Sequence, residues 1–470
     1  MPKSPGQELF ERLGRKTPNV WEKVKDAERE AIFTFAEGYK SFLTRAKTER
    51  LAAKEILRLA AEAGVRPLEG IEPGQPPAAG AKFSLVNRGK EIALIAWGRE
   101  PLASGLVLVG AHLDSPRLDL KPRPLYESQG LALLKTHYYG GIKKYQWVAM
   151  PLALYGVVIK ATGETLELCI GEDPGDPAFT ITDLLPHLAK DQVKRLLMEG
   201  IAGEELNVLV GSIPYADEDV KEKVKLAVLD YLNRQYGLVE EDFISAELEL
   251  VPAGPARDLG WDRSLVAGYG QDDRSSAYAG LRAFLDLEAP AHTAVLLLVD
   301  KEEIGSIGNT AAQSNFLQLV VDRLSACEGK QTSVREILRR SRALSADVAA
   351  AQDPTWEDVM DKYNAARLGG GVVLSKYTGA GGKYNANDAH AEYVAQIRQL
   401  FNANQVIWQT GELGKVDQGG GGTIAGYLAN LGLEVVDCGP ALLGMHSPFE
   451  VSSKADIYMS YRAYQAFFNS

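Results

Sequence analysis

Short, wholly apolar segments recur along this chain, and several of them end in charged residues. GLVLVGAHLD reaches His112, and TAVLLLVDKEE (293–303) ends in two glutamates; similar segments are ALSAD (343–347), NQVIWQT (404–410) and LEVVDCG (433–439). A strand that is covered on both faces is apolar at nearly every position. Because helix-like stretches separate several of these strands, the pattern predicts an α/β fold with a mostly parallel central sheet.

The N-terminal part of the chain has a different spacing. From Val20 to about Ala63, apolar residues recur every three or four positions, which predicts amphipathic helices that end before the Pro- and Gly-rich stretch 67–80. KFSLV and IALIAWG then flank the turn-like sequence Asn87-Arg88-Gly89, which is typical of paired strands.

Between about Leu120 and Pro255 the pattern changes again. Alternating segments rich in Tyr and Val, such as YQWVAMPLALYGVVIKA and ETLELCI, surround the acidic turn EDPGDP. This alternation predicts a mostly β unit, residues 121–254, inserted into an α/β unit formed by 1–120 and 255–470. A chain of 470 residues and 51.0 kDa exceeds the size of a single growing core, which also favours two domains.

The composition of the chain limits the kinds of binding partner that are expected. The net charge of -11 and the pI near 5.3 argue against nucleic acid and anionic membranes, because both bind basic surfaces. The three cysteines have no metal-site or disulfide spacing, and neither a secretory leader nor an apolar run of membrane-spanning length is present in the sequence. We therefore expect a cytoplasmic protein.

Several acids and imidazoles stand where a metal centre would need them. In α/β sheets, ligands gather at the carboxyl ends of the strands. Two divalent cations that share a carboxylate can activate water at neutral pH. The sequence therefore predicts metal-assisted hydrolysis, with the candidates His112, Asp272, Glu302, Glu303, Asp347 and His446.

Several candidates also have a structural explanation, and Asp347 and His446 are not distinctive when taken alone. The Asp114 carboxylate is near enough to orient His112 for a metal, but an isolated pair of this kind is more often a hydrogen-bonded turn. Asp272 and Asp273 precede the helix-like RSSAYAGLRAFLDL, where capping explains an acid as well as ligation does.

The adjacent pair Glu302 and Glu303 is stronger evidence for a metal site. Two adjacent carboxylates after AVLLLV repel each other and lose hydration unless a cation compensates them, although a solvated pair in a loop is the alternative. The remaining histidines have no such setting and are expected to be structural or exposed: His137, His187, His292 and His390.

The run of four glycines 419–422 lacks the Lys-Ser or Lys-Thr of a phosphate-binding loop. It is expected to form a flexible wall near the substrate, or else a plain turn.

Seven segments of the chain resemble, in the same order, motifs of the aspartyl aminopeptidase and aminopeptidase I family. They are AHLDSPRL, THYYGGIKKYQW, QDDRSS, DKEEIGS, LSADVA, DQGGGGTIA and GMHSP. Members of this family are co-catalytic zinc exopeptidases that form tetrahedral dodecamers. The resemblance extends over nearly the whole chain from about residue 40, and DKEEIGSIGNT and DQGGGGTIA are closer to the bacterial aminopeptidase I branch. It implies a phosphorylase/hydrolase-like zinc-peptidase domain, an inserted dimerisation domain, and a dodecamer built from dimers.

The resemblance also implies roles for single residues and a reaction. Two divalent ions per subunit, zinc or else manganese or cobalt, would share a water that attacks the first peptide bond of a peptide substrate. Asp114 would orient one ligand and Glu302 would be the general base. The implied ligands are His112 and Asp347 for one metal, Glu303 and His446 for the other, and Asp272 as the bridge.

Two departures and two rival functions remain at this stage. Family members usually continue ADxAHAVHPN, whereas Asp347 is followed by Val348 and three alanines, and Asp191 stands where a second histidine of the insert would be. These departures leave open which residue the enzyme recognises at the N-terminus of its substrate. The resemblance to the bacterial branch alone predicts a neutral or apolar residue there. The rivals are another binuclear-metal amide hydrolase, such as a deacylase or carboxypeptidase, and a non-catalytic scaffold of the same fold.

Overall fold

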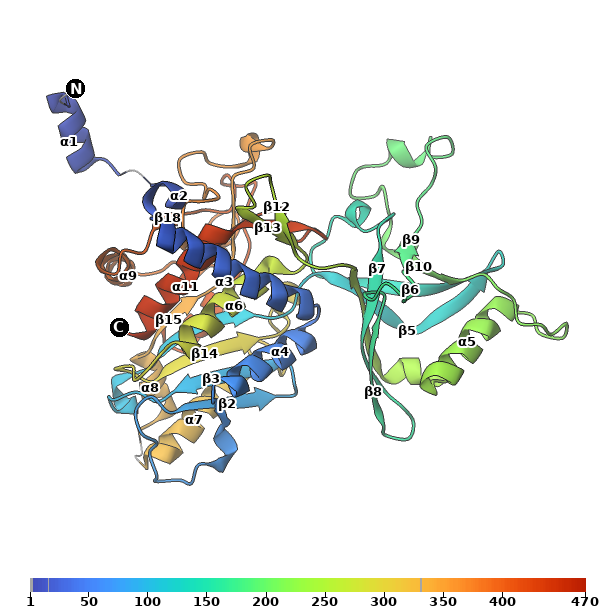
Figure 1. Cartoon of the computed structure of the whole chain (residues 1–470), viewed down its shortest axis with the longest axis horizontal. Helices are drawn as coiled ribbons and strands as arrows, with labels where there is room; N and C mark the ends of the chain where they lie inside the picture. Colours follow the sequence, from blue (N-terminus) through green and yellow to red (C-terminus); the bar gives the residue numbers. More distant parts are fainter. Residues whose placement is uncertain (1–2, 16, 330–331) are drawn as a thin grey trace.

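The computed structural model describes residues 3–15, 17–329 and 332–470. Figure 1 shows two lobes joined by a narrow connection: an α/β lobe built from both ends of the chain, and a second lobe built from its middle. Among the described residues, no helix has both the length and the apolar character needed to cross a membrane.

The α/β lobe is built on a sheet of nine strands in the order β1-β2-β3-β14-β4-β15-β19-β17-β18. Its four central strands, β14, β4, β15 and β19, run parallel, whereas β3 and β17 join them antiparallel. The predicted α/β class is confirmed, and the sheet is mixed. The strands are β1 Arg66–Pro67, β2 Lys82–Asn87, β3 Glu91–Ala96, β4 Val107–His112, β14 Ala294–Val299, β15 Arg342–Ser345, β17 Val372–Ser375, β18 Trp408–Thr410 and β19 Glu434–Gly439.

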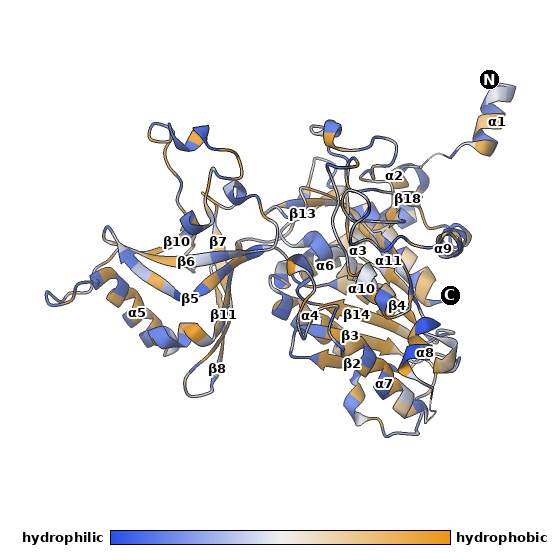
Figure 2. Cartoon of the chain, turned by 180° about the vertical axis from the view of Figure 1, so that it is seen from behind, coloured by the Kyte–Doolittle hydropathy of each residue, from blue (hydrophilic) through white to orange (hydrophobic). Residues whose placement is uncertain are grey.

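Helices cover both faces of this sheet. Side chains of β14 alternate between two cores, with Leu296 and Leu298 in one and Val295 and Leu297 in the other. All residues of β4 and β14 are buried, as their apolar sequences predict, and the strands are strongly apolar in Figure 2. The first face carries α3 Asp26–Arg45, α4 Glu49–Glu62, α6 Gln271–Leu285, α9 Ala391–Ala403 and α11 Lys454–Phe468; the second carries α7 Phe316–Glu328, α8 Val334–Arg339 and α10 Ala425–Asn430.

Two short helices precede this layer. The single turn α2 (Val20–Lys23) packs Val20 against α11, while α1 (Pro5–Leu13) buries no residue and projects from the lobe (Figure 1).

The second lobe contains an antiparallel sheet of seven strands in the order β8-β7-β11-β5-β6-β10-β9, with α5 (Lys223–Tyr236) beside it. Its core forms around Trp147 and the inward side chains of the strands. The first strand of this sheet, β5, begins at Arg117, ahead of residue 121. The strands are β5 Arg117–Ser128, β6 Leu131–Tyr139, β7 Leu152–Ile159, β8 Thr165–Ile170, β9 Thr180–Ile181, β10 Asn207–Gly211 and β11 Ala246–Pro252.

A small third sheet, which the sequence patterns did not predict, joins residues from three parts of the chain. Its strands have two to four residues, too few to show a period in the sequence. The loop that carries His446 lies between two of them. In sheet order they are β12 Arg257–Leu259, β13 Leu265–Gly268, β21 Glu450–Ser453, β20 Ala441–Leu443 and β16 Ala349–Ala350.

Candidate metal centre

Three neighbouring strands bring candidate residues to one edge of the main sheet. His112 is the last residue of β4, which lies between β14 and β15. Glu302 and Glu303 follow β14 in a short 3-10 turn, Glu302–Ile304, and Asp347 follows β15. Parallel neighbours in a sheet are about 4.8 Å apart, so their carboxyl ends meet at one place.

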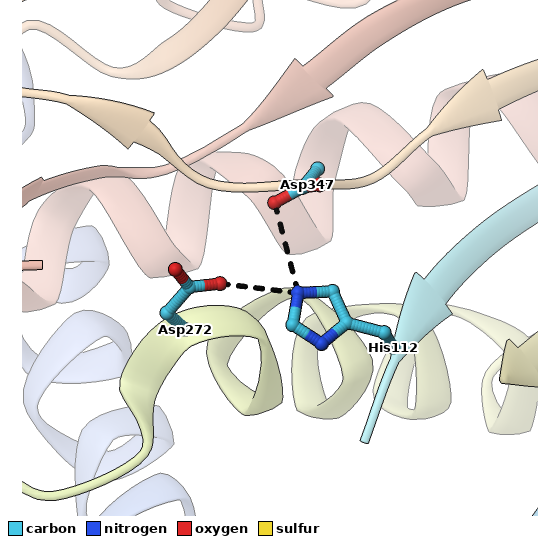
Figure 3. Close-up of side chains that lie close together, drawn as sticks. All are labelled: His112, Asp272 and Asp347. Atoms are coloured by element: carbon cyan, nitrogen blue, oxygen red, sulfur yellow. Dashed lines mark hydrogen bonds and ion pairs between the residues drawn. The ribbon is translucent and has the colours of Figure 1, made fainter. Parts of the chain in front are cut away.

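Asp272 adds a carboxylate from the start of α6. Its backbone is not helical, with φ -80° and ψ 110°, and the side chain points at the end of β4. Asp272 Oδ1 lies 3.1 Å from His112 Nε2, and Asp347 Oδ1 lies 3.9 Å from the same nitrogen. Figure 3 shows the two carboxylates converging on this ring nitrogen. These three side chains form a first ligand group.

His446 completes a second group on the other side of Asp272. Its Nε2 lies 3.3 Å from Asp272 Oδ2 and 3.3 Å from Glu303 Oε2. Its Nδ1 lies 2.9 Å from the carbonyl oxygen of Gly141, and a proton on Nδ1 that donates to this carbonyl leaves Nε2 facing the carboxylates. Within each group the possible ligand atoms all lie within 4.8 Å of one another, and Asp272 belongs to both groups.

Asp114 lies beneath both groups and is fully buried. One oxygen accepts the backbone N–H of Glu302 at 3.1 Å and lies 3.3 Å from His112 Nδ1. The other accepts the N–H of Glu303 at 3.2 Å and the hydroxyl of Tyr139 at 2.8 Å. The sequence suggested contact with His112 alone, and the structure adds the turn of the two glutamates.

Glu450 is a buried acid whose part in this site the sequence analysis missed. Its carboxylate accepts backbone N–H groups from Gln271 at 2.6 Å, Asp272 at 3.2 Å and His446 at 2.8 Å. It therefore holds the backbones of Asp272 and His446 in place together. Burial, followed by the charge of Asp272, raises the pKa of Glu450 to about 8. In the sequence, Glu450 is distinguished only as an acid four residues after His446. The structure places it at a buried strand position.

The electrostatics of the groups favour a bound cation. Burial raises the pKa of Glu302 to about 7, and burial followed by the charge of Asp272 raises the pKa of Glu303 well above its usual value. Although burial alone lowers the pKa of His446, Asp272 and Glu303 raise it to about 10. The buried Oε1 of Glu303 has no hydrogen-bond partner. A divalent cation would compensate this concentration of negative charge.

The donor set fits particular ions. Imidazole nitrogens and carboxylate oxygens are ordinary zinc ligands, and a site this rich in oxygen also suits manganese or cobalt. The residues present therefore fit two divalent cations on either side of Asp272.

A cleft of about 860 Å³ opens above the two groups. It is lined by Asp272, Glu302, Glu303, Asp347 and His446, by Val348 to Ala350 and by the glycines 420–422. Its described lining contains no lysine or arginine. At Gly419 an added Cβ would collide with the carbonyl oxygen of Leu413, so the packing of the glycine run itself requires a residue without a side chain there.

The other histidines lie outside both groups. His137, His187 and His390 are exposed, and His390 faces Glu434 at 3.2 Å. His292 is partly buried ahead of β14. A larger hollow of about 1120 Å³ between α4 and the strands β7 and β8 is lined by none of the candidate ligands.

The fold and the cleft define a class: an α/β protein with a candidate centre for two metal ions at the carboxyl edge of its sheet. Residues 42–468 match the family model described as aminopeptidase I zinc metalloprotease (M18), and the chain belongs to this family. This match confirms the family that the ordered motifs predicted. It also confirms the predicted activity, that of a zinc-dependent aminopeptidase, which is a hydrolase.

Relatives match over almost their full length. The "Probable M18 family aminopeptidase 1" of Clostridium acetobutylicum is 50% identical over 455 residues, which cover 96% of this chain and 98% of the relative. The crystal structure of an M18 aminopeptidase from Thermotoga maritima superposes with a TM-score of 0.92 at 48% identity, covering 97% of this chain and 99% of that chain. That of aminopeptidase I from Clostridium acetobutylicum gives 0.91 at 46% identity, covering 97% and 100%.

Proposed function

We propose that this enzyme removes N-terminal residues from peptides with two divalent cations per subunit, zinc in the first instance. His112 and Asp347 would hold one cation, and Glu303 and His446 the other. The observation that carries the proposal is that both ligand groups share the Asp272 carboxylate. A shared carboxylate is what a co-catalytic pair requires, because it sets the two cations a few ångströms apart.

When bound, such cations supply Lewis acidity, which polarises a carbonyl and makes a water easier to deprotonate. Glu302 lines the cleft without belonging to either ligand group, so its carboxylate is available as the general base. It would accept the proton of the attacking water and return it to the leaving amine. Asp114 would keep His112 in the orientation that presents Nε2.

The cleft also supports a substrate class. Beyond the two cations, an acidic side chain on the N-terminal residue would find no described lysine or arginine in the lining of the cleft to pair with. Val348 and the two alanines of β16 leave an uncharged wall beside Asp347. The proposed substrates therefore carry a neutral or apolar N-terminal residue, and their free amine would meet the acidic groups.

The larger assembly and its compartment belong to the same proposal. Residues 1–120 with 255–470 would form the catalytic domain, and 121–254 the dimerisation domain of a tetrahedral dodecamer. A distant yeast neighbour, 20% identical with a TM-score of 0.73, is described as a dodecamer. A cytoplasmic location fits three unpaired cysteines.

A substrate panel with metal quantification tests this function. Amino-acid amides and p-nitroanilides should be cleaved, and N-acyl amino acids should not. Leucyl substrates should exceed aspartyl substrates in kcat/KM by at least ~10-fold, because an uncompensated charge costs more than about 1.4 kcal/mol. Cleavage of blocked substrates alone would indicate a deacylase or carboxypeptidase, and a protein that gains no activity with zinc, manganese or cobalt would be a scaffold.

A further inference from the structure

We infer that Tyr139, a residue of the second lobe, is a positioning residue of the metal centre in the α/β lobe. It acts through Asp114, whose carboxylate supports one ligand in each of the two groups. The inference rests on the proposed metal site but assigns that site a residue from outside the sheet that carries it.

Asp114 divides its contacts between the two groups. Its Oδ1 lies 3.3 Å from His112 Nδ1 and accepts the N–H of Glu302, while its Oδ2 accepts the N–H of Glu303. The hydroxyl of Tyr139 donates to the same Oδ2 at 2.8 Å. Of the described donors to this oxygen, the phenol is the one that comes from the second lobe, and it makes the shorter hydrogen bond. His112 Nδ1 also lies 3.0 Å from the backbone carbonyl of Asp114. The phenol helps to orient the Asp114 carboxylate, which is the second contact of this nitrogen and the acceptor of the Glu303 N–H.

The Tyr139 ring is itself held firmly. Tyr139 ends β6 and pairs across the sheet with Arg117 of β5. The guanidinium carbon of Arg117 lies 3.9 Å from the ring centroid, close enough for a cation–π contact. Arg117 is in turn held by Asp119 at 2.8 Å and by Glu249 at 3.3 Å. A chain of contacts thus runs from the second sheet to both ligand groups.

This arrangement predicts an effect on metal binding that is separate from substrate binding. Loss of a hydrogen-bonding partner of a metal ligand weakens metal affinity or activity by about 10- to 100-fold, and Tyr139 acts on such a partner, Asp114. Tyr139 does not belong to the lining of the cleft, so its hydroxyl has no direct contact through which to change KM. Phenylalanine keeps the ring on Arg117 and removes only the donor.

The test compares Tyr139→Phe with the matched control Tyr138→Phe in the full chain. Tyr138 is the neighbouring residue, is 41% exposed and stacks on His137 away from the ligand groups. Zinc affinity is measured by competition with a chromophoric chelator, and the visible spectrum of the cobalt-loaded protein reports the ligand geometry. Y139F should bind zinc about 10- to 100-fold more weakly with an altered cobalt spectrum and a KM within about twofold of the wild type, while Y138F matches the wild type.

A double-mutant cycle then shows the route. In the Asp114→Asn background, adding Y139F should cause no further loss of zinc affinity, because the two residues act as a unit. Wild-type zinc affinity and an unchanged cobalt spectrum in Y139F would overturn the inference, as would losses that add. If Y139F does not fold, Arg117→Lys loosens the same ring, and unchanged zinc affinity there would overturn it equally. A wild-type protein that binds no zinc would instead defeat the proposed function.

Discussion

Oδ2 of Asp272 lies 3.3 Å from Nε2 of His446, at the boundary between α6 and the small third sheet. The other oxygen of the same carboxylate lies 3.1 Å from His112 at the end of β4. Glu450 holds Asp272 and His446 together through their backbone N–H groups. The Asp272 side chain therefore links a histidine at the end of a central strand to a histidine in a loop of the small third sheet.

Replacing Asp272 and Asp347 should have different effects on metal content. Asp347→Asn should lower the occupancy of one metal, because Asp347 belongs to one group. Asp272→Asn should lower the occupancy of both. Zinc per subunit, measured by elemental analysis after gel filtration, checks the difference. Equal losses in the two variants would contradict the assignment of Asp272 as the bridge.

Glu302→Gln should separate metal binding from turnover. Glu302 belongs to neither ligand group, so the variant should keep its zinc while kcat falls by about 10²- to 10⁴-fold, the usual contribution of general acid–base catalysis. Steady-state kinetics and elemental analysis on one preparation check this. Near-normal turnover would remove Glu302 from the role of base.

Removal of the metals should abolish activity reversibly. Incubation with a strong chelator should stop cleavage of a leucyl amide, and zinc, manganese or cobalt should restore it. The same chelator already saturated with zinc is the control. The apo protein should also unfold at lower temperature, because ligands that bind only the folded chain stabilise it. Full activity after complete demetallation would contradict a metal-dependent mechanism.

The patterns along the sequence predicted the central sheet and named the residues that form the two candidate ligand groups. The apolar runs of β4 and β14 are long enough to identify buried strands, and their order puts His112 and Glu303 at one edge. His446 was harder to place, because the small third sheet that carries its loop has strands of two to four residues. Glu450 and Tyr139 matter through contacts between segments distant in sequence, which no local pattern reveals.

The contact between the lobes gives a stability prediction. Glu49 of α4 is fully buried, 2.8 Å from Lys90 and 3.4 Å from Arg117. Glu49→Gln removes the buried carboxylate that Lys90 and Arg117 share and leaves each cation only its other acidic partners. It should lower the free energy of unfolding in urea titrations by up to about 3 to 5 kcal/mol. The exposed pair Lys54 and Glu167, at 2.7 Å, is the control: Glu167→Gln should change it by less than about 1 kcal/mol.

The stability of the Glu49→Gln variant should depend less on acid pH than that of the wild type. Burial alone raises the pKa of Glu49, but Arg117 and Lys90 lower it below its usual value of 4.5. A carboxylate with a depressed pKa contributes stability above its unfolded value, and this stability is lost as the pH falls below about 4.5. E49Q should therefore lose less stability than the wild type between pH 6 and pH 3. An equal loss in both proteins would show that Glu49 does not contribute to acid sensitivity.

The most direct test of the account is anomalous diffraction at the zinc absorption edge from crystals grown with zinc. We expect two peaks about 3.5 to 4 Å apart, one beside His112 and Asp347 and the other beside Glu303 and His446, with the Asp272 carboxylate between them. A single peak, or peaks that do not contact Asp272, would contradict the shared-carboxylate centre on which the proposed mechanism depends.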